Sequence, residues 1–396
     1  MSVGDAPPGI VVGGQANAVS VARSLTRAGV EVYALGDAAS AVRHSRACGT
    51  FVDGGRGAEV QARWMQWLAT GPRRGVLLPC SDEALEMIVR NRAMLVELGY
   101  RPFEVDDRVA LAMLDKARTY ALARRLGISA PQTLTVRGPD DIARVGDEIG
   151  FPCALKPLHS HVFQRHRGGR TKAFVVAGED ELRARVLEMR AVGVEMLATE
   201  IIPGADDQLR CYYTYLDERG RPLFHFTKRM IRQFPVGFGT GSYHITSWDP
   251  EVVRVGLAFV QGAGVRGLAH VELKRDPRDG ALKFIECNHR FTAPNELIRV
   301  AGLDLALFVY NRLAGRPAVL PSSYQTGVRL WHPVEDARAF ATLRRRGEIT
   351  LVEWLASVAR PAHVPVFRWK DPNPSLRTGL RRALRLARRE AEAIRP

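Results

Sequence analysis

The N-terminal part of the chain alternates short apolar runs with amphipathic stretches. Ile10 to Gly14 is predicted to be a buried strand that ends in glycines, Val19 to Ala28 a helix, and Val30 to Leu35 a second strand. A further apolar run covers Val76 to Cys80. Strands that alternate with helices in this way are typical of a doubly wound α/β unit. We therefore expect such a domain over residues 1–105.

The pattern changes after this domain. Residues 106–126 have helical periodicity, and Gly127 to Pro131 is expected to end that helix. From there, runs of strand type dominate. The predicted strands cover residues 132–136, 153–157, 172–176, 195–202, 209–216 and 223–231. The chain is therefore expected to continue from an α/β domain into an α+β region.

Two further runs of strand type form a hairpin over residues 267–290. Its turn is Asp276 to Gly280, and folding the chain about that turn sets Glu272 within one position of Glu286. Because side chains alternate along a strand, Glu286 and Asn288 share a face. Two carboxylates about 4 Å apart repel by roughly 4 kcal/mol at an effective dielectric constant of 20, so such a pair normally shares a proton or a cation.

An amide oxygen beside two carboxylates favours Mg²⁺, which prefers oxygen ligands and is usually shared with substrate phosphates. The alternative is an exposed hairpin with two solvated glutamates. The hairpin by itself leaves both interpretations open.

The C-terminal part combines aromatic residues with a basic stripe. Trp331, Trp354 and Trp369 are expected to anchor it, because buried aromatic side chains dominate such contacts. From Leu376 to Ala387, apolar residues recur at spacings of three and four, as on one face of a helix. Arginines at 377, 381, 382, 385, 388 and 389 surround that face. We expect the helix to pack on its own protein, with an anionic partner as the alternative.

Composition narrows the class of protein. With 396 residues and 46% hydrophobic content, the chain is long enough for two or three domains. Its net charge of +15 is not accompanied by interleaved aromatic residues or a nucleic-acid-binding motif, so no specific nucleic-acid partner is expected. No apolar stretch reaches the roughly 20 residues of a membrane-spanning helix. The 5 cysteines form no Cys-x-x-Cys pair, which favours a reducing cytoplasm and argues against structural zinc.

A long polar segment from Pro157 to Lys172 separates two predicted strands. Loops of this length are usually functional or disordered. Its histidines are His159, His161 and His166, with no cysteine or acid cluster nearby, which disfavours a metal site. Its basic side chains are Arg165, Arg167, Arg170 and Lys172. Such a cluster suits phosphates and acidic substrates equally.

Five motifs follow one another through the second part of the chain. They are Lys116, Phe151-Pro-Cys-Ala-Leu-Lys156-Pro157, Thr199-Glu-Ile-Ile-Pro-Gly-Ala-Asp206-Asp207, Glu272, and Glu286-Cys-Asn288-His-Arg290. In this order and spacing they resemble the ATP-grasp superfamily over about residues 106–315. Ser20 to Leu25 and Pro79 to Glu83 look most like the carboxylate–amine ligases related to D-aspartate ligase.

The resemblance implies an architecture of α/β and α+β type. A doubly wound pre-ATP-grasp domain over residues 1–105 would be followed by a two-lobed ATP-grasp domain over residues 106–320. The small lobe would cover about residues 131–200 and the large lobe about residues 201–320. Residues 321–396 would form an extension that carries the basic helix.

The resemblance also implies where ATP binds. Lys116 and Lys156 would hold the phosphates as compact cations. Adenine would contact the backbone of Glu200 and Ile202. The acid after Pro203-Gly204 would hold the ribose, and both Asp206 and Asp207 fit that position.

Metal and substrate sites are implied by the same family pattern. Glu272, Glu286 and Asn288 would bind Mg²⁺, with two ions expected and Glu286 bridging them. Charge on the transferred phosphoryl group would be stabilised by Arg290, Lys228 and Arg229. The substrate side would include Ser81, Asp82, Gly239, Gly241 and Ser242. Ser81 also fits a helix N-cap, and the glycines fit a flexible connection.

Together these implications predict an ATP-dependent ligase that joins a small carboxylate to an amine. The carboxylate would become an acyl phosphate, and the amine would then displace phosphate, with ADP as the other product. Such chemistry depends on positioning and electrostatics, so no nucleophilic side chain is required. The oligomeric state is not readable from the sequence, although a homodimer is common in similar ligases.

Two other functions remain open from the sequence. A nicotinamide oxidoreductase would use the first domain, but the glycine pattern at residues 13–17 is not G-x-G-x-x-G. A non-catalytic nucleotide sensor or scaffold would keep an ATP pocket without turnover, and the intact acids and lysines disfavour it. Which carboxylate and amine are joined is not readable from the sequence.

We predict that the segment from Pro157 to Lys172 is mobile alone and ordered by MgATP, because its cationic side chains repel one another until phosphates bind. Limited proteolysis checks this. Saturating MgATP should protect the segment from cleavage, whereas an unchanged cleavage rate would exclude its role as a lid.

Overall fold

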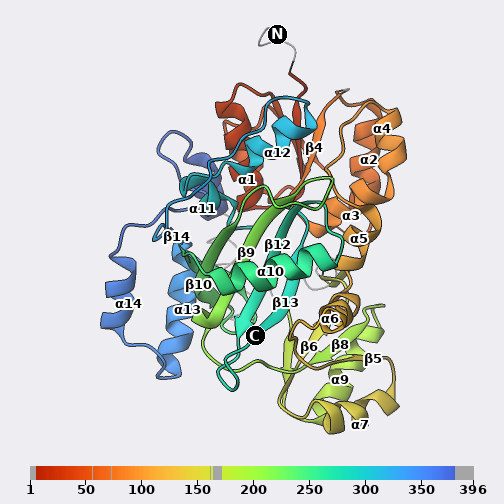
Figure 1. Ribbon diagram of the computed structural model, residues 1–396, viewed down its shortest axis with the longest axis vertical. Helices are drawn as coiled ribbons and strands as arrows, with labels where there is room; N and C mark the ends of the chain where they lie inside the picture. The colour runs from red at the N-terminus through yellow and green to blue at the C-terminus, as the bar shows by residue number, and fades with distance from the viewer. Residues whose placement is uncertain (1–5, 56, 73, 161, 164–171, 380–396) are drawn as a thin grey trace, which may run out of the picture.

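The computed structural model describes residues 6–379 except 56, 73, 161 and 164–171. Several predicted features lie outside the described residues: Arg165, Arg167, Arg170, His161, His166, and the basic helix from residue 380 onward. The described chain is built on three β-sheets (Figure 1). The first lies at the top of that view, the central sheet below it, and the third at the lower right.

The first sheet is parallel, with strand order β3-β2-β1-β4. Its strands are β1 (Gly9–Val12), β2 (Val32–Gly36), β3 (Thr50–Asp53) and β4 (Val76–Pro79). The accompanying helices are α1 (Ala16–Arg27), η2 (Ala41–His44), α2 (Val60–Thr70), α3 (Asp82–Arg90) and α4 (Arg92–Glu97). Val11 packs in the cluster that contains α1, whereas Ile10 and Val12 pack with Trp64 of α2. Both faces of the sheet are thus covered, which confirms the doubly wound α/β prediction.

A pair of short helices leads out of this unit. The sequence predicts one helix over residues 106–126, but the structure has two, α5 (Asp107–Met113) and α6 (Lys116–Arg125). Asp115 separates them, because its side chain accepts a hydrogen bond from Arg118 N at 3.1 Å and so caps α6. The cap fixes the start of α6, where Lys116 lies.

The small antiparallel sheet has strand order β5-β8-β6-β7. Its strands are β5 (Thr133–Val136), β6 (Cys153–Pro157), β7 (Phe174–Val176) and β8 (Met196–Thr199), and its helices are α7 (Pro139–Glu148) and α9 (Glu179–Arg190). Leu155 and Ala198 of the sheet pack with Val145 of α7 and Leu182 of α9 in one buried cluster. This sheet and its helices lie between Thr133 and Thr199, inside the range of about residues 131–200 proposed for the small lobe.

The central sheet has strand order β13-β12-β9-β10-β11-β14. Its strands are β9 (Leu209–Leu216), β10 (Phe226–Phe234), β11 (Thr240–Thr246), β12 (Gly267–Arg275), β13 (Leu282–Asn288) and β14 (Arg329–Trp331), with η3 (Asp206–Gln208) before β9. Helix α10 (Pro250–Gly262) covers one face, where its Phe259 packs with Tyr212 and Val271. The opposite face packs through Tyr215 and Leu268 on α11 (Asn295–Val300), α12 (Leu305–Leu313) and the first domain.

The C-terminal part extends the central sheet as well as covering it. Strand β14 pairs with β11, and α13 (Pro333–Arg345) and α14 (Leu351–Val358) follow. The boundary proposed at residue 320 therefore precedes a strand of the central layer. Trp354 Nε1 donates to Asp336 at 3.0 Å, so this aromatic residue is anchored. Trp369 is 89% exposed, and its predicted role as an apolar anchor is wrong.

Asp371 ties the end of the described chain to the first domain. Its carboxylate accepts hydrogen bonds from Arg23 at 2.8 Å and from Ser45 Oγ at 2.6 Å, while its Oδ1 accepts from Arg46 N at 3.1 Å. The Arg23 side chain is only 6% exposed, so the ion pair lies largely out of water. The C-terminal part therefore contacts both the first domain and the central sheet.

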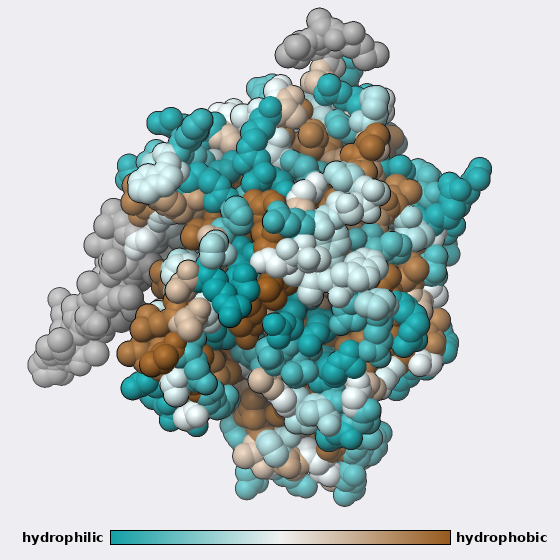
Figure 2. All heavy atoms as spheres, turned by 60° about the vertical axis from the view of Figure 1, so that its left-hand side comes forward, coloured by the Kyte–Doolittle hydropathy of each residue, from teal (hydrophilic) through white to brown (hydrophobic). Residues whose placement is uncertain are grey.

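The surface seen in Figure 2 is mostly hydrophilic, with scattered apolar areas. Helix α14 contributes to the exposed apolar surface through Leu351, Val352 and Leu355. None of the helices in the described part of the chain combines the length and the apolar content that a membrane span needs.

Candidate active site

Strands β12 and β13 bring the predicted metal-binding acids together. Glu272 and Glu286 are direct partners across this antiparallel pair, and a register shift follows between Glu272 and Leu273. Cys211 of β9 is the partner of Glu272 on the other side, and Lys228 of β10 is the partner of Cys211. One row of side chains therefore crosses four strands on one face, with two acids at one end and a lysine at the other.

The two acids differ in how easily they ionise. Burial and the charge of Glu286 raise the pKa of Glu272 to about 7. Burial also acts against ionisation of Glu286, but Lys172, Lys116 and the Asn288 amide outweigh it and hold the Glu286 pKa below its usual value. One acid is thus held ionised, and the other needs an added cation to ionise fully at neutral pH. This donor set suits a divalent oxygen-binding metal.

Asn288 and Arg290 continue the polar arrangement along β13. Asn288 Nδ2 donates to Glu286 Oε1 at 3.0 Å, and the Arg290 guanidinium donates to Asn288 Oδ1 at 3.0 Å. Arg290 also donates to Asp82, which lies in the first turn of α3. Ser81 caps that helix, because its Oγ accepts from the α3 backbone at 3.1 Å. The first domain therefore fixes the orientation of the arginine.

The two predicted phosphate-binding lysines reach the same region from the small sheet and α6. Lys116 Nζ donates to Ser160 Oγ at 2.6 Å, and Lys156 Nζ donates to Tyr120 OH at 3.5 Å. Burial lowers the pKa of Lys156 to about 8 and also lowers the pKa of Lys116. Glu286 acts on both lysines in the opposite direction. Both cations therefore lie within electrostatic reach of the metal-binding acids.

Residues 200–205, which we call the hinge segment, connect the small sheet to η3. At its start, Glu200 N donates to Gln132 O at 2.9 Å, and the Glu200 carboxylate pairs with Arg278 in the β12–β13 turn. Ile202 is buried. The backbone of this segment runs between the two lobes, where the family pattern places adenine.

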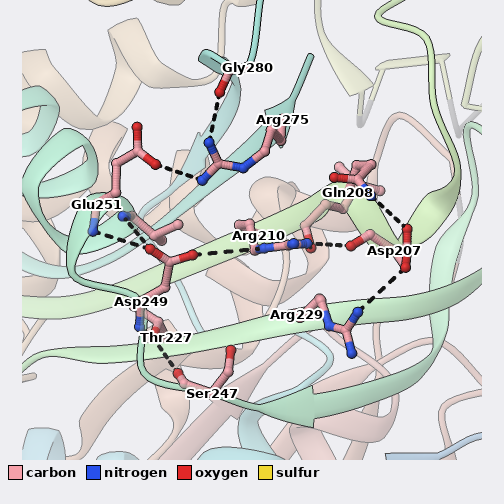
Figure 3. Close-up of polar contacts among 12 residues, drawn as sticks. Asp207, Gln208, Arg210, Thr227, Arg229, Ser247, Asp249, Glu251, Arg275 and Gly280 are labelled. Carbon is pink, nitrogen blue, oxygen red and sulfur yellow. Dashed lines mark hydrogen bonds and ion pairs between the residues drawn. The ribbon is translucent and has the colours of Figure 1, made fainter. Parts of the chain in front are cut away.

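The two candidate ribose acids lie on different sides of the chain. Asp206 is buried and accepts from Gln233 Nε2 at 2.7 Å, from Gln233 N at 3.1 Å and from Gly237 N at 3.2 Å. Burial raises its pKa. Asp207 pairs instead with Arg229 at 3.4 Å, on the face that α10 covers (Figure 3). The sequence does not distinguish these adjacent acids, whereas the structure shows that their side chains have different surroundings.

A cavity of about 660 Å³ lies between the first domain and the acid-bearing strands. The first domain contributes the carboxyl ends of its strands, including Gly13, Gly36 and Asp37, together with Trp64, Ser81 and Asp82. The central sheet contributes Lys228, Met230, Gly239, Gly241, His244, His270, Glu272, Glu286, Asn288 and Arg290. Open parallel sheets bind ligands at this edge. The cavity therefore brings predicted catalytic, metal-binding and substrate-binding residues to one space.

No family model matches the chain. A D-aspartate ligase of Enterococcus faecium (strain Aus0004) is 26% identical over 312 residues, which cover 76% of this chain and 73% of that protein. The biotin carboxylase domain of the Hydrogenobacter thermophilus 2-oxoglutarate carboxylase aligns with a TM-score of 0.63 at 17% identity, covering 81% of this chain and 73% of that chain. An L-amino acid ligase from Bacillus licheniformis aligns with a TM-score of 0.57 at 15% identity, covering 78% and 75%.

These likenesses support the predicted ATP-grasp carboxylate–amine ligase. The two structures show the fold, and the sequence relative is itself a ligase. The predicted recognition, the two-lobed fold and the ATP-dependent joining of a carboxylate to an amine are thereby confirmed. The comparisons favour this function over the oxidoreductase and scaffold alternatives.

Arg229 is the clearest correction to the predicted site of this ligase. It follows Lys228 on β10, so the two side chains point to opposite faces of the sheet. Arg229 is the strand partner of Arg210, and both lie with Asp207 and Asp249 on the α10 face (Figure 3). Arg229 therefore does not reach the cavity.

Ser242 is also absent from the cavity wall. It is fully buried, its Oγ donates to Asp336 at 3.1 Å, and its carbonyl accepts from His332 N at 2.8 Å. Its partners belong to the C-terminal part, so the predicted substrate contact is wrong. Gly239 and Gly241 do line the cavity. Gly241 has a local reason to be glycine, since a Cβ there would lie 2.0 Å from the His244 ring.

The sequence analysis missed His270 and His244, which line the cavity, and Cys211, which contacts Lys228 beside it. His270 stacks on Tyr213 with ring centroids 4.1 Å apart and lies 3.5 Å from Glu272. Cys211 and His244 accept hydrogen bonds from Lys228 at 3.1 and 3.3 Å. The alternation of β12 could have identified His270, two positions before Glu272. Cys211 and His244 depend on strand register, which no local pattern revealed.

Proposed function

We propose that this ligase uses MgATP to phosphorylate a small carboxylate and that an amine then attacks the acyl phosphate. The oxygen of the acyl phosphate leaves with the phosphate as the new C–N bond forms, and the amine loses a proton. The observation that carries this proposal is the direct pairing of Glu272 with Glu286 beside Asn288, within electrostatic reach of Lys116 and Lys156.

Glu272, Glu286 and Asn288 would hold the magnesium. Their oxygens fit a hard cation, and the buried Glu272 and Glu286 carboxylates, paired across the hairpin, concentrate the negative charge that such a cation would balance. Two ions are proposed, as the family pattern implies, and the charge of Glu286 acts on both lysines that would hold the phosphates. The metal would neutralise charge on the transferred phosphoryl group.

Arg290 and Lys228 supply positive charge on the substrate side. Arg290 is held by Asn288 and Asp82, so its orientation is set before substrate binds. Lys228 is 1% exposed, and its hydrogen-bond partners among the described residues are a thiol and an imidazole, Cys211 and His244. An anionic group in the cavity would balance that charge. We assign it to the carboxylate or acyl phosphate.

The nucleotide is proposed to lie along the hinge segment, with the backbone of Glu200 and Ile202 at adenine and both small-lobe lysines at the phosphates. Asp206 is the acid that we place beside the ribose, because Asp207 is turned towards α10. Its three hydrogen bonds leave about one lone-pair position of the carboxylate for a ribose hydroxyl.

The test is phosphate release and amide formation with a panel of carboxylates and amines. D-Aspartate is the first acid to try, since the sequence relative is named for it. Release of phosphate that requires both a carboxylate and an amine, with one amide formed per ADP, supports the proposal. MgATP binding without turnover for any pair would favour the sensor alternative. Sedimentation of the same protein determines whether it forms a homodimer.

The magnesium requirement should increase as pH falls. Because the folded pKa of Glu272 is about 7, above its usual value of 4.5, protons compete with the metal below neutrality. We expect the Mg²⁺ concentration for half-maximal rate to rise about tenfold from pH 8 to pH 6 at constant MgATP. The Glu272→Gln variant should lose most of this pH dependence. Equal Mg²⁺ requirements at both pH values in the unmodified enzyme would exclude Glu272 as a ligand.

A further inference from the structure

Lys274 connects the acid-bearing strand to the hinge segment. It lies two positions after Glu272 on β12 and therefore on the same face of the central sheet. Its Nζ donates to Ile202 O at 2.9 Å and to Gly204 O at 2.9 Å. A single side chain from the large lobe thus holds two carbonyl groups of the hinge segment.

The turn of the same hairpin holds the hinge segment at its other end. Arg278 pairs with Glu200 and also with Asp276, whose carboxylate is buried. Gly204 has φ +91°, and a Cβ at that position would lie 3.5 Å from Pro277. The hairpin and the hinge segment therefore lie in close contact. A small displacement of the hairpin turn should therefore shift the hinge segment, and the reverse should also hold.

Lys274 lies beside the space assigned to the nucleotide, in a region shared with other charged groups. Burial lowers its pKa, Asp206 and Asp276 oppose that change, and Lys156 is near enough to lower the pKa further. An ammonium has three N–H donors. Two are used on the hinge carbonyls, and the third forms no hydrogen bond with the part of the chain that the structure describes.

We propose that Lys274 is a positioning residue for the nucleotide. It holds the hinge carbonyls in one orientation and offers its third N–H to the bound base or ribose. This inference rests on the proposed placement of the nucleotide along the hinge segment. Replacing Lys274 should weaken nucleotide affinity. Without its hydrogen bonds the hinge segment has to be ordered when the nucleotide binds, and this ordering reduces the net binding free energy. It should leave turnover of the bound nucleotide nearly unchanged, since Lys274 contacts none of the reacting groups.

The decisive comparison uses Lys274→Met, which keeps the chain length but removes the donors. Lys283→Met is the matched control, because Lys283 is the β13 partner of Lys274 but donates to Asp279 at 2.8 Å. Calorimetric titration of each protein with MgADP gives affinity without requiring turnover. We expect Lys274→Met to raise the Kd for MgADP about tenfold. A change of this size matches the free energy of one charge-assisted hydrogen bond or of two neutral ones. Lys283→Met should change it less than twofold.

Steady-state kinetics and the conservative variant separate positioning from simple stability. Lys274→Met should raise the KM for MgATP with kcat within about twofold, and Lys274→Arg should recover most of the affinity. An unchanged Kd in Lys274→Met, or an equal loss in Lys283→Met, would overturn the proposal. If the unmodified protein binds MgADP but forms no amide with any substrate pair, the proposed ligase function is wrong. The comparison of MgADP affinities still decides the role of Lys274 in that case. No binding of MgADP would overturn both.

Discussion

Replacing Glu286 by glutamine should abolish ligation while leaving the fold intact. The substitution preserves size but removes the charge that Lys116, Lys172 and the bound metal share. We expect kcat/KM for MgATP to fall at least about 100-fold, because metal ligands and their supporting charges carry effects of this size. The melting temperature without nucleotide should fall slightly, because the lowered pKa of Glu286 means that its charge stabilises the folded protein.

Glu272→Gln is the matched comparison for that variant. Glu272 is the direct strand partner of Glu286. Because its pKa is about 7, a part of the Glu272 side chains is already protonated at neutral pH. The loss should therefore be smaller, and higher Mg²⁺ should recover part of it. Both variants are assayed for phosphate release over a range of Mg²⁺ concentrations. A Glu286→Gln enzyme that keeps half its activity at low Mg²⁺ would contradict a metal-binding role.

Asp336→Ala should cause the largest loss of stability. Asp336 is fully buried and accepts from Arg232 at 2.8 and 2.9 Å, from Ser242 at 3.1 Å and from Trp354 at 3.0 Å. Removing it leaves the Arg232 guanidinium, in a residue 5% exposed, without a counter-ion. Breaking a buried pair from one side costs about 3–5 kcal/mol in unfolding free energy. Denaturant unfolding measures this change directly.

A double variant and a surface control complete that experiment. Arg232→Met with Asp336→Leu should recover much of the loss, because no charge then remains buried. Glu348→Ala removes an exposed partner of Arg346, 3.8 Å away, and should change stability by less than about 1 kcal/mol. If Asp336→Ala is no worse than Glu348→Ala, the buried network does not hold α13 to the central sheet.

Local patterns determined much of the site because a strand repeats every two residues. The turn at Asp276 to Gly280 set the pairing of Glu272 with Glu286, and alternation put Asn288 beside Glu286. The apolar runs of the first domain likewise predicted a doubly wound unit. In these cases the information lay within one hairpin or one strand–helix unit, so nearby residues were sufficient.

Tertiary structure decided the features that depend on which strands become neighbours. Lys228 faces the cavity and Arg229 faces α10 because β10 pairs with β9 in a particular register, which the sequence of β10 alone does not specify. Ser242 lost its predicted role because Asp336, far along the chain, reaches it from α13. The contact of Lys274 with the hinge segment likewise joins residues about seventy positions apart. Sequence determined the local chemistry of this ligase, and long-range packing determined which of those groups share one space.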